Sequence, residues 1–169
     1  MKPKLRFRTN QIKKIASRYE YSISEDELRA LRSVVQKRGH ITKDELQKMA
    51  YWKAPRSSGH IKSNSEEYVQ EITGAALGAI QERSRIEILT LLDGVSWPTA
   101  SVILHFCHQD PYPIIDFRAM WSVGLDVPLR YGFGIWWCYA EFCRKIASES
   151  DIDMRTLDRA LWQYSKENQ

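Results

Sequence analysis

Helix-initiation signals recur along this chain, and they constrain its fold more than any other feature. S-E-D-E from Ser24 predicts a capping box with Glu27, and T-K-D-E from Thr42 predicts a second one. After the first signal, apolar residues recur at helical spacing, at Leu28, Leu31, Val34 and Val35. We find no convincing alternation of apolar and polar residues of the kind that a half-buried strand shows. The sequence therefore predicts an all-α protein.

Turn signals divide the chain further. Gly39 predicts the end of the first helix, and Pro55 and Gly59 interrupt the pattern within KAPRSSGHIKSNS, residues 53–65. Ser65, followed by two glutamates, predicts a helix running to about Gln81. We expect two helical lobes joined around residues 53–65.

The second half of the chain predicts five more helical segments. The amphipathic run SRIEILTLL leads into a turn at residues 93–97, and Pro98 suits the first turn of the next helix. A further helix is expected to begin at Asp116, and two others near residues 134–148 and 153–165. The aromatic side chains of the segment 134–148 are expected to lie mainly in the core.

Composition sets broad limits on location and partners. The chain has 169 residues, 43% of them hydrophobic, with a formal charge of +4 and a pI near 9.0. This mild basic excess suits nucleic acid but does not require it. No apolar run reaches the roughly 18 residues that a membrane span needs, and MKPKLRFRTN lacks the apolar core of a signal peptide. We expect a cytoplasmic protein without a membrane partner.

Cysteine usage argues against a metal centre. Cys107, Cys138 and Cys143 are an odd set without a secretion signal, which favours free, buried thiols in a reducing compartment. An iron–sulfur cluster usually takes four thiolates. His105 and His108 flank Cys107, but H-x-C-H lacks the paired spacing of a zinc site. We therefore expect no metal and no cofactor.

The turn after SRIEILTLL has features of a phosphate-binding hairpin. Gly94 permits a positive φ or a close backbone approach, and the helix beginning at Pro98 offers the positive end of its dipole. Thr99 adds a hydroxyl group. Such a contact would position DNA without reading its sequence. The alternative interpretation is an ordinary turn between two helices.

Two motifs together resemble one enzyme family. LDGVSWPTA, residues 92–100, is similar to the L-P-G-V-G-x-x-T-A hairpin of the helix-hairpin-helix base-excision DNA glycosylases, which include endonuclease III and the adenine-DNA glycosylases. YPIIDFRAMWSVG, residues 112–124, resembles the segment in which that family carries its catalytic aspartate, at the position of Asp116. The likeness covers residues 84–124, with the hairpin at about 84–106. It implies one two-lobed, all-α glycosylase-like domain over residues 1–169, acting as a monomer on double-stranded DNA that contains a modified base.

The resemblance implies that Asp116 is the catalytic residue. Breaking an N-glycosidic bond builds positive charge on the sugar, which a carboxylate beneath the ring stabilises while it orients water. The base must first leave the helical stack and enter a pocket. The alternative role for Asp116 is the N-cap of the helix that follows it. The two roles are compatible, because a capping carboxylate is already held rigidly.

Three departures from the family pattern qualify this expectation. Asp93 stands where the family has proline, so its charge would lie near a bound phosphate, and Ser96 replaces a glycine but still offers donors. Pro98 occupies the place where bifunctional members carry a lysine, eighteen residues before the aspartate. Proline forms no Schiff base, so the resemblance implies base removal without strand cleavage. Lys53 or Lys62 would be the substitute amine, although no spacing supports either.

The segment YWKAPR, residues 51–56, is a second candidate for contacting DNA. Trp52 would stack on an extruded base, while Lys53 and Arg56 would hold phosphates. The alternative is a helix C-terminus at which the cations complement the dipole and Trp52 covers the core. Trp97 is likewise a candidate for the base pocket or for core packing.

We predict a monofunctional DNA glycosylase that leaves an abasic site, either in base-excision repair or in defence against phage DNA with modified bases, and that associates with the nucleoid. The family resemblance assigns DNA contacts to Gly94, Ser96 and Thr99. The alternative is a non-catalytic helix-hairpin-helix module that binds DNA or a protein. A nuclease is disfavoured because no second carboxylate is placed near Asp116 to hold magnesium.

Overall fold

The computed structural model describes residues 2–21, 23–128 and 130–169, and every regular element within these ranges is a helix. The expected all-α class is confirmed. The chain divides into two compact units, one formed by residues 1–22 with 111–169 (unit 1) and the other by residues 23–110 (unit 2). Within the described ranges, no helix combines the length and apolar character that crossing a bilayer demands.

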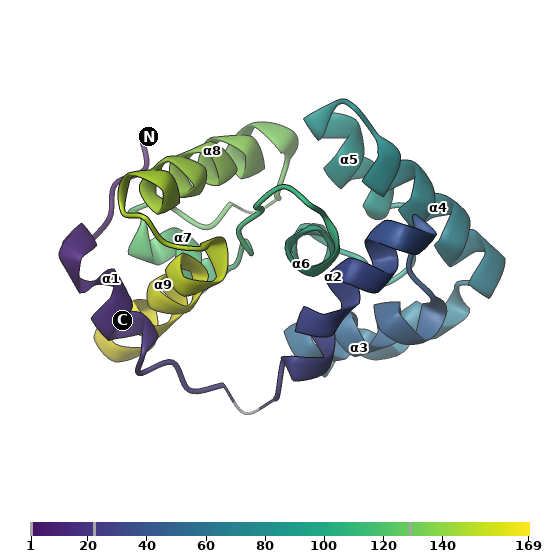
Figure 1. The fold of residues 1–169 in the computed structure, drawn as a ribbon, viewed down its shortest axis with the longest axis horizontal. Coiled ribbons are helices and arrows are strands. Elements are labelled where there is room, and N and C mark those ends of the chain that lie inside the picture. Colours follow the sequence, from purple (N-terminus) through teal and green to yellow (C-terminus); the bar gives the residue numbers. More distant parts are fainter. Residues whose placement is uncertain (1, 22, 129) are drawn as a thin grey trace. The chain divides into compact units, whose positions relative to one another are not determined.

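Unit 2 is built around α6, Trp97–Cys107. All residues of this helix from Thr99 onward are buried, and it packs against α2, α3 and α5. Figure 1 shows α6 almost end-on, with those helices around it. The other helices of unit 2 are α2 (Asp26–Arg38), α3 (Lys43–Lys53), η2 (Ser58–Ser63), α4 (Glu66–Gly78) and α5 (Glu82–Leu89). The helical run from residue 98 therefore supplies the centre of this core.

Unit 1 is built around α9, Met154–Asn168, which contacts helices from both ends of the chain. The N-terminal segment contributes η1 (Thr9–Gln11) and α1 (Ile12–Ala16), and the C-terminal part contributes α7 (Phe117–Ser122) and α8 (Phe133–Glu149). On α8, Trp136 and Tyr139 are fully buried, as the expected core role requires. The packing of α1 on α9 makes the first twenty residues an integral part of this unit.

Several helix boundaries agree with the sequence signals. Thr42 and Glu45 form the predicted capping box, with Thr42 N donating to Glu45 Oε2 at 2.7 Å. Gly39 ends α2 with φ +85°, and Ser65 caps α4 by accepting a hydrogen bond from Tyr68 N. These signals act within four residues, so a single local segment determines them.

The predicted capping box at Ser24 and Glu27 is wrong. The Ser24 hydroxyl accepts from Asp26 N at 3.2 Å and donates to the Asp26 carboxylate at 3.0 Å, and Glu25 takes the N-cap position of α2. Asp26, one residue before the expected partner, competes successfully for the serine. The helix from Ser65 also stops at Gly78, short of Gln81: Ala79 is extended, with φ −65° and ψ 136°, and its carbonyl accepts from Arg85 Nη2 at 2.6 Å.

Residues 53–65, expected to join two lobes, lie inside unit 2. Pro55 follows the end of α3, but the chain continues as η2, which packs on α3, with Ile61 fully buried. The unit boundaries fall instead at residues 22/23 and 110/111. Proline and glycine therefore mark the end of a helix here, and not the end of a compact unit.

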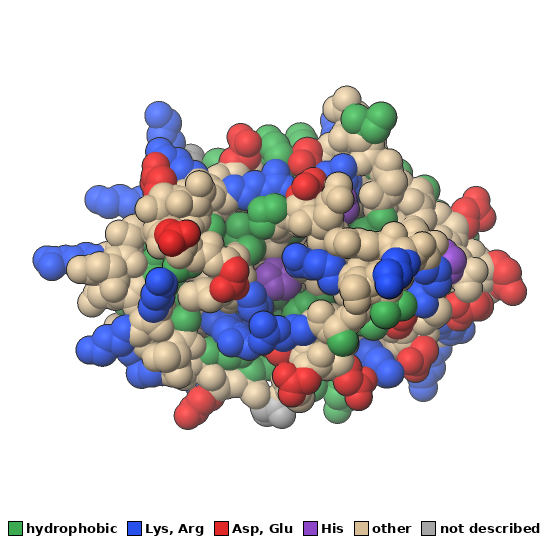
Figure 2. Space-filling model, viewed as in Figure 1, with side chains coloured by type: hydrophobic (Ala, Val, Ile, Leu, Met, Phe, Trp, Pro, Cys, Tyr) green, Lys and Arg blue, Asp and Glu red, His purple; other side chains and the backbone are tan. Residues whose placement is uncertain are grey.

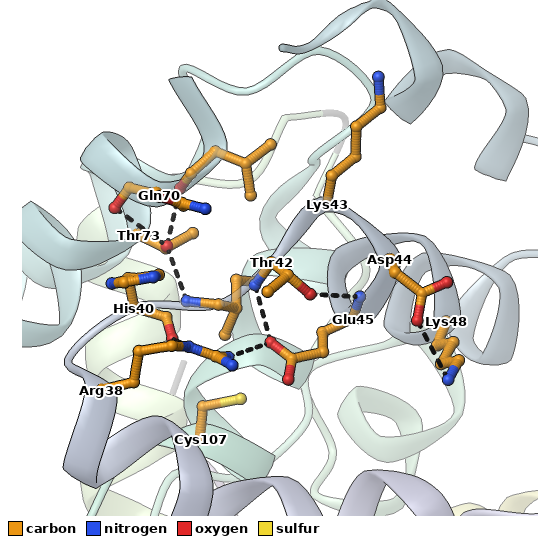
Figure 3. Close-up of polar contacts among 12 residues, drawn as sticks. Arg38, His40, Thr42, Lys43, Asp44, Glu45, Lys48, Gln70, Thr73 and Cys107 are labelled. Carbon is orange, nitrogen blue, oxygen red and sulfur yellow. Dashed lines mark hydrogen bonds and ion pairs between the residues drawn. The ribbon is translucent and has the colours of Figure 1, made fainter. Parts of the chain in front are cut away.

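A buried threonine fastens the α2–α3 turn to α4. Thr73 Oγ1 accepts a hydrogen bond from Ile41 N at 3.1 Å and donates to Val69 O at 2.7 Å, and its side chain is completely buried. Figure 3 shows this bond beside the Thr42–Glu45 capping box, where the Arg38 guanidinium also contacts Glu45. One hydroxyl group thus joins two segments 32 residues apart.

Thr73→Val should lower the free energy of unfolding by about 1–3 kcal/mol, because it leaves the buried Ile41 amide without this acceptor at nearly constant side-chain volume. Urea unfolding followed by circular dichroism measures the change. The exposed Thr9→Val is the matched control, with an expected change within about 0.5 kcal/mol. Equal stability of the Thr73 variant and the wild type would contradict this account of the turn.

Candidate functional site

The turn between α5 and α6 combines buried anchors with an exposed tip. Leu92 and Val95 are buried in unit 2, whereas Asp93, Gly94 and Ser96 are exposed. Gly94 has φ +78°, and Val95 N donates to Leu92 O at 3.1 Å. The positive φ expected at Gly94 is therefore present.

Asn64 holds this turn from a distant segment. Its side-chain Oδ1 accepts from Asp93 N at 2.9 Å, and its Nδ2 donates to Asp93 O at 2.9 Å. Asn64 is only 3% exposed and lies directly after η2. Because both backbone groups of Asp93 are paired with one amide, the turn has a defined orientation. No sequence signal identified Asn64, since its partner lies 29 residues away.

Gly94 also lies close to η2. A Cβ atom at Gly94 would stand 3.0 Å from Ile61 N and 3.0 Å from His60 Cβ. A small open pocket of about 430 Å³ adjoins this contact, lined by Gly59, His60, Ser63, Asp93 and Gly94. Both the positive φ and the close approach therefore require glycine at position 94.

The Asp93 carboxylate is directed to a hydroxyl group. Ser63 Oγ donates to Asp93 Oδ2 at 2.9 Å, and both residues are exposed. This bond satisfies one oxygen but leaves the negative charge in place. The Asp93 carboxylate is therefore the group expected to repel a phosphate near the turn.

The N-terminus of α6 follows the tip. Ser96 is the N-cap, with φ −85° and ψ 172°, but within the described residues its side chain makes no capping hydrogen bond. Pro98 occupies the second helical position, and the first turn carries no acidic residue. The Thr99 side chain is buried, so the expectation that its hydroxyl contacts DNA is wrong, whereas Ser96 is exposed.

Asp116 is the N-cap of α7 in unit 1. Its Oδ1 accepts from Ala119 N at 2.8 Å, with φ −155° and ψ 174°, and the side chain is half-buried. The capping role considered for this residue is confirmed. Two residues earlier, the Ile114 backbone is held on both sides: its N donates to Asp158 Oδ1 at 3.1 Å, and its carbonyl accepts from Tyr139 OH at 3.0 Å.

Tyrosine side chains from three segments lie within electrostatic reach of Asp116. The pKa of Tyr21 and that of Tyr131 are raised, first by burial and then by the negative charge of Asp116. The pKa of Tyr139 is raised well above its usual value by complete burial, with smaller contributions from Cys143, Asp158 and Asp116. Tyr21 and Tyr131 are both partly exposed. The charge of Asp116 thus acts on two partly exposed tyrosines, Tyr21 and Tyr131, and on the buried Tyr139.

The ring of Tyr21 belongs to a larger cluster of partly exposed side chains. We call Tyr19, Tyr21, Trp162, Arg118 and Arg155 the aromatic–arginine cluster. Tyr21 stacks on Tyr19, with centroids 6.2 Å apart, and meets Trp162 edge-on at 5.6 Å. The guanidinium of Arg118 lies 5.3 Å from the Trp162 ring, and Arg155 Nη2 donates to Tyr19 OH at 3.1 Å. Flat rings and cations of this kind suit a nucleobase.

The other predicted contact residues belong to unit 2. Trp52 is 5% exposed, and its ring meets Phe106 edge-on at 5.5 Å, which fits the core-packing alternative. Lys53 is the last residue of α3 and is partly exposed, whereas Arg56 is fully on the surface. Trp97 begins α6 and is partly exposed. Their roles toward DNA remain predictions.

The cysteines differ in environment. Burial, with the nearby negative charge of Glu45, raises the pKa of Cys107 to about 12, and burial likewise raises that of Cys143. Cys138 is exposed, so the expectation that all three thiols are buried is wrong for this residue. It lies on the solvent side of α8, next to the buried Tyr139 and two residues after the buried Trp136.

Compared with models of known protein families, with curated proteins and with solved structures, the chain gives no match.

Proposed function

We propose that this protein is a monofunctional DNA N-glycosylase that extrudes a modified base and hydrolyses its bond to the sugar. The observation that carries the proposal is Asp116 itself, a half-buried carboxylate that caps α7 and whose charge acts on the partly exposed Tyr21 and Tyr131. The second support is the resemblance of residues 84–124 to the helix-hairpin-helix glycosylases. Both point to the same residue.

The chemistry assigned to Asp116 follows from its charge and its rigidity. As the N-glycosidic bond breaks, positive charge grows on the sugar, and a fixed carboxylate stabilises that charge without reorganising. The hydrogen bond from Ala119 N restricts the carboxylate position. The two hydrogen bonds that hold the Ile114 backbone restrict the segment that carries it. The second carboxylate oxygen is then the group assigned to orient the attacking water.

The aromatic–arginine cluster is the part of unit 1 proposed to receive the base. Every nucleobase has a π-face, so stacking on Tyr21 or Trp162 would hold an extruded base next to Asp116. Burial of the base against these rings would offset part of the cost of leaving the helical stack. Trp52, expected to stack on the base, is instead packed in the core of unit 2, and the role of Trp97 stays a prediction.

The turn at Gly94 is the proposed anchor for the DNA strand. The first turn of α6 presents amide groups at a helix N-terminus, where phosphate binds favourably. Ser96 adds an exposed hydroxyl, while the buried Thr99 side chain supports the turn from within. Lys53 and Arg56 are proposed as further phosphate contacts.

Pro98 predicts the product. A lysine at this position would attack the sugar and permit strand cleavage, whereas proline has no amine to do so. The expected product is an intact strand with an abasic site. The substrate class follows from the family likeness: an alkylated or oxidised purine in repair, or a modified base of phage DNA in defence.

A non-catalytic hairpin module is the second candidate, and two observations favour it. The exposed Asp93 carboxylate stands at the tip of the turn, and unit 2 has eleven Lys and Arg against twelve Asp and Glu, a formal charge of −1. Both features weaken attraction to phosphate at the hairpin. A protein partner would tolerate them better than a DNA strand.

Base release under single-turnover conditions distinguishes these candidates. Wild-type protein is incubated with duplexes carrying alkylated, oxidised, deaminated or phage-modified bases, and the strand is analysed with and without alkali. A glycosylase without lyase activity gives cleavage only after alkali. Absence of release from every duplex, with the DNA still bound, would favour the binding module.

A further inference from the structure

The basic excess of the chain is confined to unit 1. This unit has fourteen Lys and Arg against nine Asp and Glu, a formal charge of +5, whereas unit 2 is at −1. Within unit 1, residues 1–22 hold seven of the cations and a single acid, Glu20. Figure 2 shows Lys and Arg side chains projecting from the left-hand side of the view, where Figure 1 places the N-terminus and α1.

Residues 2–18, which we call the basic arm, are ordered because main-chain and apolar contacts attach them to unit 1. Lys4 N donates to Val123 O at 2.8 Å, and Arg6 N donates to Ser122 O at 2.9 Å, so the extended chain pairs with the end of α7. Phe7 is buried against the Tyr164 ring, at 4.6 Å between centroids.

Helix α1 is attached in the same way. Ile12 and Ile15 are buried, and the helix packs on α9, so its lysines are turned outward. Arg18 pairs with Glu167 through two hydrogen bonds of 2.8 and 2.6 Å, and this pairing holds the pKa of Glu167 at about 2. The pairing of Arg18 with Glu167 therefore persists across ordinary pH.

Five arm cations face solvent without a counter-charge: Lys2, Lys4, Arg8, Lys13 and Lys14. Among the described residues, no carboxylate lies within ion-pairing distance of any of them. The cations of unit 2 differ, since Lys48 pairs with Glu27 and Asp44 at 3.3 and 3.1 Å. Arg83 likewise pairs with Glu87 at 3.0 Å. Cations held on a fixed frame without partners repel one another, and binding a polyanion relieves that repulsion.

We propose that this basic arm binds the phosphate backbone of duplex DNA, independently of base sequence. The choice of DNA rests on the proposed function, but the binding does not require catalysis. The arm compensates for the negative charge of unit 2 by supplying the electrostatic part of the affinity from another part of the chain. A membrane surface fits less well, because Phe7, Ile12 and Ile15 are buried and leave the arm no apolar face to insert.

The salt dependence of DNA affinity tests the arm directly. The variant Lys4→Gln/Lys13→Gln/Lys14→Gln removes three of the exposed charges, and binding to a short unmodified duplex is measured between about 50 and 200 mM salt. Each lost phosphate contact removes roughly 0.9 from the slope of log K against log salt, so the slope should fall by about 2.7. Over this range the wild type should lose roughly 40-fold more affinity than the variant.

The control variant is Arg29→Gln/Lys37→Gln/Lys48→Gln, which makes the same charge change on exposed positions of α2 and α3. It should leave the slope near the wild-type value. Equal slopes for both triple variants, or no change in the arm variant, would overturn the inference. Thermal melts of all three proteins establish that they are folded.

Two further outcomes separate this inference from its alternatives. If vesicles containing phosphatidylserine bind the wild type but not the arm variant, while duplex affinity is unchanged, a membrane is the occupant and the DNA inference fails. If the wild type releases no base from any duplex but the slopes differ as expected, the glycosylase proposal fails and the arm inference stands.

Discussion

Asp116→Asn should slow single-turnover base release by roughly 10²–10⁴-fold while leaving DNA affinity close to that of the wild type. Asparagine has nearly the same shape, and its side-chain oxygen still accepts from Ala119 N, so the N-cap of α7 persists. What disappears is the negative charge proposed to stabilise the sugar cation. The measurement is the rate of abasic-site formation at saturating protein.

Asp153→Asn is the matched control for this substitution. Asp153 caps α9 through the same type of bond, from Thr156 N to its Oδ1 at 2.8 Å, and it is exposed. The control should release base at the wild-type rate and change stability by no more than about 1 kcal/mol. Equal rates for wild type and Asp116→Asn, on a duplex that the wild type processes, would reduce Asp116 to a structural cap.

A second readout of the same variant does not depend on catalysis. The charge of Asp116 contributes to the raised pKa of Tyr21 and of Tyr131. Removing that charge should move the pKa of both phenols down, toward the usual value, in a spectrophotometric titration. An unchanged titration would contradict the proximity of these rings to the carboxylate.

Gly94→Ala should destabilise the turn between α5 and α6. A non-glycine residue at φ +78° costs about 1–3 kcal/mol, and the new Cβ would meet Ile61 N and His60 Cβ at 3.0 Å. Since the Ile61 contact is with backbone, relief requires η2 or the turn to move. We expect a lower free energy of unfolding and faster hydrogen exchange at Asp93 N, which bonds to Asn64.

Gly78→Ala provides the matched control. Gly78 ends α4 without a positive φ, and no atom lies within 4 Å of a Cβ placed there. Alanine should therefore leave stability unchanged or raise it by up to about 1 kcal/mol. If Gly94→Ala were as stable as this control, the close approach of η2 would not constrain the turn. DNA affinity, measured in parallel, should fall for Gly94→Ala alone.

Sequence reasoning succeeded where the determining contact is short-range. The capping box at Thr42, the ending at Gly39 and the caps at Ser65 and Asp116 each depend on atoms within four residues. It failed at Ser24, where Asp26 and Glu27 offered competing partners two and three residues away. Even there, only the register of the helix start changed, because the apolar spacing of α2 was unaffected.

The candidate site was only partly visible in the sequence. Residues 92–100 and Asp116 stand out because a turn and a helix start have local signatures. Asn64, Tyr21 and Tyr131 have none, since each is brought to its place by contacts with residues far along the chain. Trp52 illustrates the reverse case, because only its packing on Phe106 revealed that it lies in the core of unit 2.

The sequence by itself determined the helical class, most helix ends and the rigid capping position of Asp116, since hydrogen bonds and φ preferences within one turn decide these. Only the tertiary structure decided that residues 53–65 support the hairpin and that the N-terminal arm belongs with residues 111–169. It also decided that the unpaired cations gather on that arm. These features arise from burial and pairing between segments tens of residues apart. The energies of such contacts depend on which surfaces meet, so no periodic sequence pattern predicts them.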